Sequence, residues 1–369
     1  MNDPLHPDLA TRDALAEAWG LSPRTRFAPL GNGLINRTLL VTDAGRRRVL
    51  QCLNVNVFRD PALVMRNCRA VTAHLGRERA AGRYDYSVLE LVPTLAGKPA
   101  AVLADGSWWR MYDHVPDTRT HDTADTPALA FEAGRGFGAF AAALAGLDRE
   151  VVGEVIPHFH DPVKRFEAFR TALAADRVGR VAQARRECDD ALAFAEVLAH
   201  WKSLLDAGLP WRITHNDCKL NNLLFDANGR AICVVDLDTV MPGTLLFDFG
   251  DMGRTMLSPV PEDSTDLARV AVRHEHFAAL ARGYIEGCGE LLTPLERDNL
   301  VFAARLVTGV IGLRFLTDHL DGDRYFRIAH PNHNLERARN QFALFASLTA
   351  QADSLQALVP DSTGSRMSC

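Results

Sequence analysis

A short β-rich island between residues 211 and 240 constrains the fold most, because helical patterns surround it on both sides. Within it, Asn222–Phe225 and Ala231–Val235 carry residues that favour strands, and the turn sequence Asp226-Ala-Asn-Gly229 separates them. This pattern is typical of a β-hairpin, whose antiparallel strands bring the two ends side by side. Residues that enter the hairpin must therefore lie close to residues that leave it.

Four polar residues around the hairpin form a pattern that suits phosphoryl transfer. The chain enters the hairpin through the pattern His-x-Asp-x-Lys-x-x-Asn, residues 215–222. Phosphoryl transfer needs a carboxylate that orients the attacking hydroxyl, a cation near the transferred phosphate, and oxygen ligands for Mg²⁺. Asp217 can supply the carboxylate and Lys219 the cation, while Asn222 and Asp236 offer hard oxygen ligands. The pattern therefore predicts an ATP- and Mg²⁺-dependent phosphotransferase; the alternative is an ordinary polar loop before a surface hairpin.

A glycine-rich turn over residues 29–38 lies between β-type segments. Gly31 and Gly33 allow the backbone to approach a ligand closely, and the amides of such turns can hold phosphate. A Gly-Asn-Gly turn alone more often marks only a hairpin. Its position ahead of the phosphotransfer pattern favours a nucleotide-binding turn, in which Gly31, Asn32, Gly33 and Asn36 are the expected contacts.

The remaining periodicity divides the chain into two lobes. Short strand patterns dominate up to about residue 115, apart from one helical pattern from Pro61 to Arg79, and helical patterns follow. We predict an α+β, bilobal fold with a small β-rich N-terminal lobe (1–115), a larger, mostly helical C-terminal lobe (116–359) and a disordered tail (360–369). The expected strands of the first lobe are Thr38–Thr42, Arg48–Leu53, Ser87–Val92 and Ser107–Tyr112. The expected helices of the second are Ala124–Leu147, Pro162–Arg177, Glu187–Ala207, Ser264–Gly287, Thr293–Leu320 and Leu335–Leu355.

Composition excludes several classes of protein. A formal net charge of −5 over 369 residues argues against a dedicated nucleic-acid binder. We expect no membrane-spanning segment, and the first residues resemble no secretory signal. None of the seven cysteines forms a CxxC pair, so a disulfide framework or zinc ribbon is not expected. The histidines outside residues 215–222, His160 among them, lack the spacing of a metal site and are expected to be structural or exposed. A cytoplasmic protein that acts on a small molecule remains, with its oligomeric state open.

Several blocks give the chain a resemblance to a known superfamily. They are Gly31-Asn-Gly-Leu-Ile-Asn36, Leu50-Gln-Cys-Leu-Asn-Val-Asn-Val-Phe58, Thr214-His-Asn-Asp-Cys-Lys-Leu-Asn-Asn222, Asp236-Leu-Asp-Thr-Val-Met-Pro-Gly243, Phe247-Asp-Phe-Gly-Asp251, Arg314-Phe-Leu-Thr-Asp-His-Leu-Asp-Gly-Asp-Arg-Tyr-Phe326 and His333-Asn-Leu335. Over residues 25–350 the chain resembles the aminoglycoside phosphotransferase and choline kinase superfamily, whose members have a protein-kinase-like fold. The block that begins at Arg314 is most similar to the N-acetylhexosamine 1-kinases.

The resemblance implies roles for individual residues. Asp217 would be the catalytic base, Asn222 and Asp236 would hold Mg²⁺, and Asp238 would assist at the metal. The positions of Arg314 and Tyr325 line the sugar pocket in the resembled family. An arginine can form a forked pair of hydrogen bonds to sugar hydroxyls or an acetamide oxygen, and a tyrosine ring can pack on a pyranose. The implied reaction is transfer from ATP to the anomeric hydroxyl of an N-acetylhexosamine.

Three positions depart from the resembled family. At one of them, Cys218 follows Asp217 where the family often has threonine, and we expect this thiol to be a small filler. Leu34 stands where the family has a histidine that contacts the sugar, and Cys52 stands where a basic residue reaches the nucleotide phosphates. These departures leave open another acceptor, such as an aminoglycoside, choline, homoserine or a different sugar, and a non-catalytic nucleotide-binding protein.

The motif Phe247-Asp-Phe-Gly-Asp251 spells the metal-binding DFG of protein kinases. Asp236 follows Asn222 by 14 residues, the length of one hairpin, whereas Asp248 follows it by 26. Asp236 is therefore the predicted metal ligand, and Asp248 or Asp251 is expected to support the catalytic loop or to cap a helix.

Overall fold

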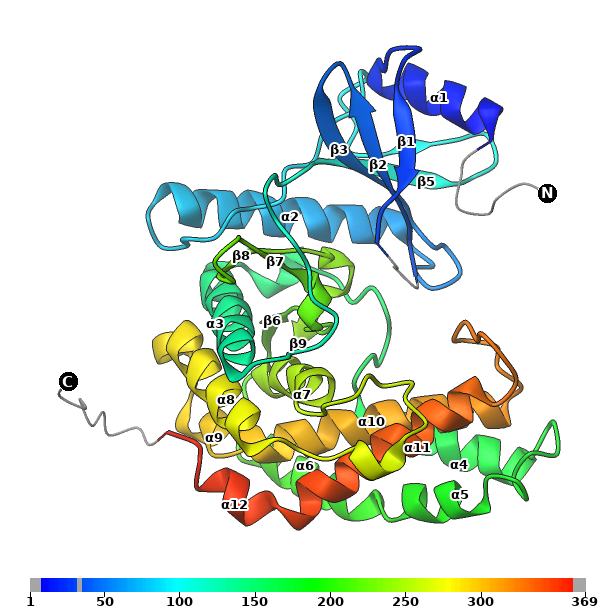
Figure 1. The fold of residues 1–369 in the computed structure, drawn as a ribbon, viewed down its shortest axis with the longest axis vertical. Helices are drawn as coiled ribbons and strands as arrows, with labels where there is room; N and C mark the ends of the chain where they lie inside the picture. The colour runs from blue at the N-terminus through cyan, green and yellow to red at the C-terminus, as the bar shows by residue number, and fades with distance from the viewer. Residues whose placement is uncertain (1–7, 32–34, 361–369) are drawn as a thin grey trace.

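The computed structural model describes residues 8–31 and 35–360 and shows two lobes (Figure 1). The N-terminal lobe is built on an antiparallel five-stranded sheet of order β1-β2-β3-β5-β4. Its strands are β1 (Arg26–Pro29), β2 (Arg37–Asp43), β3 (Arg46–Cys52), β4 (Ala101–Val102) and β5 (Trp108–Asp113). These features confirm the predicted α+β, bilobal, protein-kinase-like fold; the lobe boundaries at residues 115 and 359 stay predictions.

Two helices flank this sheet. Helix α1 (Leu9–Trp19) covers one face, where Leu15 and Trp19 pack against Leu39, Leu50 and Trp109. Helix α2 (Pro61–Ala80) lies on the other side, between the sheet and the helical lobe (Figure 1). Asp60 caps α2 and a proline follows in its first turn, as the sequence predicts for a helix start.

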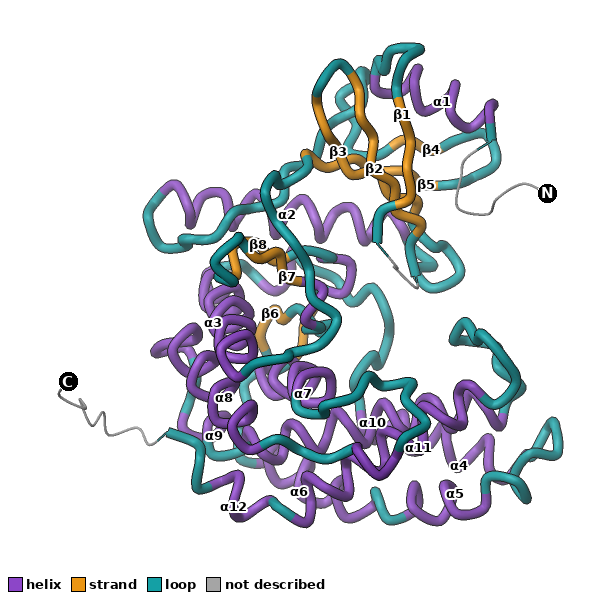
Figure 2. The backbone as a smooth tube through the Cα atoms, in the orientation of Figure 1, coloured by secondary structure: helices purple, strands orange, loops and turns teal. Residues whose placement is uncertain are grey.

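The C-terminal lobe is mostly helical, and its short strands lie near the N-terminal lobe (Figure 2). β6 (Arg212–Thr214) pairs with β9 (Met241–Gly243), and β7 (Leu223–Phe225) pairs with β8 (Ala231–Val234), which confirms the predicted hairpin. The helices are α3 (Pro127–Ala143), α4 (Pro162–Ala175), α5 (Arg185–Leu192), α6 (Ala195–Asp206), α7 (Leu245–Met256), α8 (His274–Cys288), α9 (Pro294–Arg297), α10 (Leu300–Leu320), α11 (His333–Ala350) and α12 (Ala352–Gln356). Single 3-10 turns link them: η1 (Leu144–Gly146), η2 (Arg149–Val151), η3 (Leu220–Asn222), η4 (Leu237–Thr239), η5 (Leu267–Arg269) and η6 (Gly289–Leu291).

The prediction of a strand at Ser87–Val92 is wrong, because this segment forms no continuous strand. This segment makes only isolated bridges, one from Ser87 to β8 and one from Leu91 to β5. Because its pairing is divided between the sheet and the hairpin, it connects the lobes and joins neither ladder. The sequence also missed α1, β1 and β4.

Four helix predictions are wrong in their extent. The helix predicted over Glu187–Ala207 breaks into α5 and α6 at Phe194, whose ring packs against Phe166 and Phe345. No Pro or Gly marks this break, so tertiary packing decides it. The helices predicted over Thr293–Leu320 and Leu335–Leu355 are likewise each divided in two, and α8 begins ten residues later than the predicted Ser264.

Helix α10 corrects the expectation about apolar segments. By length and composition its 21 residues could cross a membrane. However, 83% of its most apolar stretch is buried inside the fold, as in the central helix of a protein core. Around it pack α4, α7 and α11.

Helices α3 and α8 pack unusually closely through glycines. Gly134 and Gly138 of α3 face Gly283 and Gly287 of α8, and a Cβ on any of them would overlap backbone atoms of the other helix. This contact supports the hairpin, because α3 also packs on β8.

We predict that Gly283→Ala destabilises the protein by about 1–3 kcal/mol, because the added methyl forces the two backbones apart. Gly76→Ala is the matched control, since Gly76 is an exposed residue of α2 and an added Cβ there would meet open space. This substitution should stabilise the fold by about 0.5–1 kcal/mol. Urea unfolding of both variants measures the difference. Equal urea midpoints for the two variants would contradict the role given to the α3–α8 contact.

Candidate active site

The loop after β6 carries the predicted catalytic residues and is held from below by α7. The carboxylate of Asp248, in the first turn of α7, accepts hydrogen bonds from the backbone N–H groups of His215 (3.1 Å) and Asn216 (2.7 Å). Asp248 is fully buried, and burial raises its pKa. The prediction that Asp248 supports the catalytic loop is confirmed.

The loop is also fixed from within. Asn216 has a left-handed backbone (φ 64°), and its side-chain amide donates to the carbonyls of Thr214, Thr239 and Met241. His215 Nε2 donates to the Val235 carbonyl at 3.0 Å. These bonds join the entry of the hairpin to its exit, as the sequence pattern predicted.

Asp217 and Lys219 form an ion pair in which Nζ lies 3.0 Å from Oδ1. Burial of Asp217 opposes its charged form, but the Lys219 ammonium outweighs this effect and lowers the pKa of Asp217 to about 2. The carboxylate is therefore ionised at neutral pH and able to accept a hydrogen bond from a hydroxyl.

Asn222 and Asp236 lie beside this pair. Asn222 Nδ2 donates to the carbonyl (2.8 Å) and to the carboxylate (3.1 Å) of Asp217, which leaves the amide oxygen available to a cation. Asp236 has a left-handed backbone (φ 56°), a strained conformation for a residue with a side chain. Burial, and then the nearby carboxylates of Asp238 and Asp217, raise the pKa of Asp236 to about 7. A positive charge placed here would relieve that repulsion.

This donor set fits Mg²⁺. The ion usually takes one or two protein oxygens and completes its octahedron with phosphate oxygens and water. Among residues 8–31 and 35–360, no group of three or more His, Cys, Asp or Glu side chains is placed to hold a metal ion.

Asp238 instead joins the lobes. It forms a buried ion pair with Arg110 of β5 and accepts a 2.6 Å hydrogen bond from Asn36 Nδ2. Asn36 Oδ1 accepts in turn from the backbone N–H of Asn54 (3.0 Å). Both carboxylate oxygens of Asp238 thus have protein partners, so its assistance at the metal, like a nucleotide contact of the Asn36 side chain, stays a prediction. Gly31 has a positive φ of 70°, and Asn32, Gly33 and Leu34 lie outside the described residues.

Cys52 and its neighbour Gln51 point to opposite faces of the sheet. Cys52 packs on the α1 face with Leu50 and Trp109. Gln51 lies on the opposite face because successive side chains of a strand alternate, and its Oε1 accepts from Arg110 Nε (3.1 Å) and NH2 (2.8 Å). Arg110 of β5 is itself buried and pairs with Asp238, so its charge is already compensated within the protein.

Arg314 and Tyr325 line one cavity with Asp217, about 120 Å³ in volume. Arg314 donates to the Tyr325 hydroxyl at 3.3 Å, and its guanidinium lies over the rings of Phe159 (4.8 Å) and Phe326 (5.4 Å). The structure thus brings the candidate acceptor-binding residues from α10 and the following loop to the catalytic loop.

Sequence reasoning missed other residues that line this cavity, among them Arg254, His160 and Arg337. Arg254 of α7 is buried and pairs with Asp251 (2.7 Å) and with Glu262. The i, i+3 spacing of Asp251 and Arg254 on one helix could have indicated that pair. No sequence signal locates His160 or Arg337, which tertiary folding brings to the cavity.

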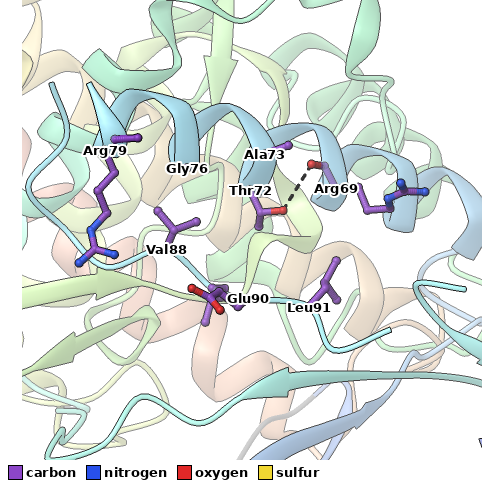
Figure 3. A pocket seen from close by; sticks show the side chains of 10 residues that line it. Arg69, Thr72, Ala73, Gly76, Arg79, Val88, Glu90 and Leu91 are labelled. Carbon is purple, nitrogen blue, oxygen red and sulfur yellow. Dashed lines mark hydrogen bonds between the residues drawn. The ribbon is translucent and has the colours of Figure 1, made fainter. Parts of the chain in front are cut away.

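A second and larger cavity, of about 780 Å³, lies between α2 and residues 88–91 (Figure 3). Arg69 and Arg79 stand toward its two ends on α2, and Val88, Glu90 and Leu91 face them (Figure 3). None of its lining residues belongs to the catalytic loop or to the hairpin.

Comparison with known proteins agrees with this geometry. Residues 26–284 match the family described as phosphotransferase enzyme family, APH. The chain belongs to this family. It is therefore a small-molecule phosphotransferase of the aminoglycoside phosphotransferase and choline kinase type.

Solved structures share the fold of this phosphotransferase at low sequence identity. A microcompartment-associated aminopropanol kinase has a TM-score of 0.60 at 17% identity, over 94% of this chain and 98% of that one. Spectinomycin phosphotransferase in complex with ADP and spectinomycin has a TM-score of 0.56 at 11% identity, over 95% and 99%. A choline/ethanolamine kinase family protein from Mesorhizobium loti has a TM-score of 0.54 at 16% identity, over 95% and 99%.

We predict that Asp248→Ala both destabilises the phosphotransferase and lowers its kcat, because two buried N–H groups of the catalytic loop lose their acceptor. The expected loss is about 2–4 kcal/mol in the free energy of unfolding. Asp248→Asn keeps one acceptor oxygen and should lose less. Asp206→Ala removes only an exposed partner of Lys202 and serves as control. If Asp248→Ala has the same free energy of unfolding as the Asp206→Ala control, Asp248 does not support the catalytic loop.

Proposed function

We propose that this phosphotransferase transfers the γ-phosphate of ATP to the anomeric hydroxyl of an N-acetylhexosamine and so produces a sugar 1-phosphate. The observation that carries the proposal is that Asp217 shares one cavity with Arg314 and Tyr325. The proposed base therefore lies in the same cavity as an arginine and a tyrosine, which are suited to bind a sugar ring. A cytoplasmic location belongs to the same proposal.

Asp217 has the properties of the base. Its ionised carboxylate accepts a hydrogen bond from the acceptor hydroxyl and orients that oxygen in line with the γ-phosphorus. The proton of the hydroxyl moves to Asp217 as the new P–O bond forms, while the bond from the γ-phosphorus to the β,γ-bridging oxygen breaks and ADP leaves. Lys219 offsets the negative charge that develops on the transferred group.

Asn222 and Asp236 would hold Mg²⁺ against the nucleotide phosphates. When bound, the ion neutralises phosphate charge and fixes the geometry of the triphosphate. The turn that contains Gly31 and Gly33 would cover those phosphates.

Charged side chains nearly balance around the acceptor cavity, whose lining holds five carboxylates and four cationic groups. The carboxylates are those of Asp217, Asp236, Asp238, Asp251 and Glu262, and the cations are Lys219, Arg254, Arg314 and Arg337. Asp251 and Glu262 both pair with Arg254, and Asp217 pairs with Lys219. Arg314 and Arg337 have no ion-pair partner within residues 8–31 and 35–360, so they can donate hydrogen bonds to the hydroxyls of a neutral sugar, whereas the ammonium group of an acceptor such as choline offers them no hydrogen-bond acceptor.

The other candidates are an acceptor that is an aminoglycoside, choline, homoserine or a different sugar, and a protein that binds nucleotide without turnover. Leu34, in place of a sugar-contacting histidine, motivates the first. Cys52, in place of a basic residue, motivates the second, and the set of Asp217, Lys219, Asn222 and Asp236 argues against it.

We predict that Asp217→Asn lowers kcat by about 10²–10⁴-fold, because the amide cannot accept the proton. Nucleotide binding should persist, since the proposed metal ligands remain. Calorimetry with Mg²⁺·ADP and a coupled ADP-release assay measure the two effects, with Asp206→Asn on the surface of α6 as control. Full turnover by Asp217→Asn would remove this residue from its role.

We predict that N-acetylglucosamine and N-acetylgalactosamine gain one phosphate at the anomeric carbon, while choline, ethanolamine and aminoglycosides gain none. Mass spectrometry and ³¹P NMR of a mixed acceptor panel measure the products. Arg314→Met should raise the acceptor KM by about 10–100-fold because a charged donor is lost, with the KM for ATP unchanged.

Arg305→Met provides the matched control, since Arg305 lies on the same helix and bonds to Thr349 outside the cavity. Phosphorylation of an amine acceptor in preference to every sugar would contradict the proposed substrate class.

A further inference from the structure

His160 lies in the loop before α4 and is almost entirely buried, with 3% of its surface exposed. It lines the same cavity as Asp217 and Arg314. Its ring packs against Phe159 and Phe247, with centroid distances of 4.5 and 5.4 Å. These contacts fix the orientation of the imidazole, so each ring nitrogen has a defined environment.

The hydrogen-bond partner of one nitrogen determines the state of the other. Nε2 of His160 lies 2.7 Å from the backbone carbonyl oxygen of Asn216, which can only accept, so Nε2 carries the proton. Nδ1 then presents a lone pair, and no described residue donates to it. Burial, with a further contribution from Arg314, lowers the pKa of His160 to about 3, so the ring is neutral at ordinary pH.

Other residues that line the cavity also carry buried polar atoms without a hydrogen-bond partner among the described residues. They are Thr239 Oγ1, Asp251 Oδ2, Arg337 Nε and Asp238 Oδ1, the last of which has only its ion pair with Arg110. Buried polar groups are normally satisfied, so five such atoms on the residues that line one cavity favour a polar ligand there. The set contains acceptors, a donor and a hydroxyl, which matches a molecule with several hydroxyl groups.

We propose that His160 is a specificity-determining residue of the acceptor site, whose Nδ1 accepts a hydrogen bond from a non-reacting hydroxyl of the bound acceptor. This inference rests on the proposed function, because it assigns a contact to a hydroxyl-rich substrate. His160 thereby supplies an imidazole to the acceptor, although Leu34 stands where the resembled family has one. Through Asn216 the same ring also supports the residue next to the catalytic base.

Two substitutions separate the two nitrogens. In His160→Gln the side-chain amide can reach the position of Nε2 and still donate to Asn216, but nothing replaces Nδ1. In His160→Asn the shorter amide takes the place of Nδ1 and loses the contact with the loop. His200→Gln is the control, because His200 is an exposed histidine of α6 that bonds to Asn299.

We expect His160→Gln to raise the KM for N-acetylglucosamine at least about tenfold, as for loss of one hydrogen bond in a buried site, with kcat and the KM for ATP within about twofold. His160→Asn should show the reverse split, with a lower kcat and a nearly unchanged acceptor KM. An unchanged acceptor KM in folded His160→Gln would overturn the proposal.

A scan of monodeoxy derivatives of N-acetylglucosamine on the wild-type protein provides a second measurement if His160→Gln does not fold. Removal of one non-reacting hydroxyl should weaken binding to the wild type at least about tenfold. If His160→Gln does fold, it and the wild type should bind the derivative that lacks this hydroxyl equally. If every derivative binds as tightly as the parent sugar, the proposal is overturned.

The two proposals fail separately. If the wild type turns over another member of the panel and no sugar, the proposed substrate class fails, and the His160 variants are compared with that acceptor. If the wild type turns over a sugar and His160→Gln matches it, only the His160 proposal fails. If the wild type binds no hydroxyl-bearing member of the panel, both are overturned.

Discussion

The carboxylates of Asp217, Asp236 and Asp238 line one largely buried cavity, where their charges repel one another. Lys219 compensates Asp217, and Arg110 compensates Asp238. Asp236 has no such partner among the described residues, so burial and the two neighbouring carboxylates raise its pKa, and its backbone is left-handed as well. The protein thus concentrates its unbalanced negative charge at one point, where a divalent cation and a triphosphate would restore the balance.

The same compensation ties the lobes together. Arg110 belongs to the sheet and Asp238 to the segment after the hairpin, so their buried ion pair crosses the cleft, and Asn36 adds a hydrogen bond from the turn that would cover the nucleotide. A buried ion pair contributes little net stability, because desolvation offsets most of its attraction. Its value here is geometric: it fixes the sheet, the turn and the proposed metal ligands relative to one another, and removing one partner would leave a buried charge unpaired.

Local patterns made the hairpin and the catalytic loop predictable. A turn sequence fixes which strands pair, and pairing then fixes that Asn222 and Asp236 lie close together. The predictions that were wrong concern features that depend on tertiary structure and are not encoded in a local sequence pattern. The side-chain direction of Cys52 depends on strand register, and the break at Phe194 depends on aromatic rings from distant helices. Residues 87–92 have the composition of a strand, but their pairing is shared between two lobes. His160 reaches the cavity from a loop whose path no periodicity describes.

The catalytic loop and the wall that carries Tyr325 rest on different carboxylates. The loop rests on Asp248, whereas the wall rests on Asp318, whose carboxylate accepts from the backbone N–H groups of residues 324–326 at 2.8–2.9 Å. Asn334 holds that carboxylate from α11. His160 links the two parts, since it lines the cavity and bonds to Asn216 of the loop. A division of this kind would let the wall vary while the loop stays fixed, and function would then depend on the side chains of the wall more than on the fold.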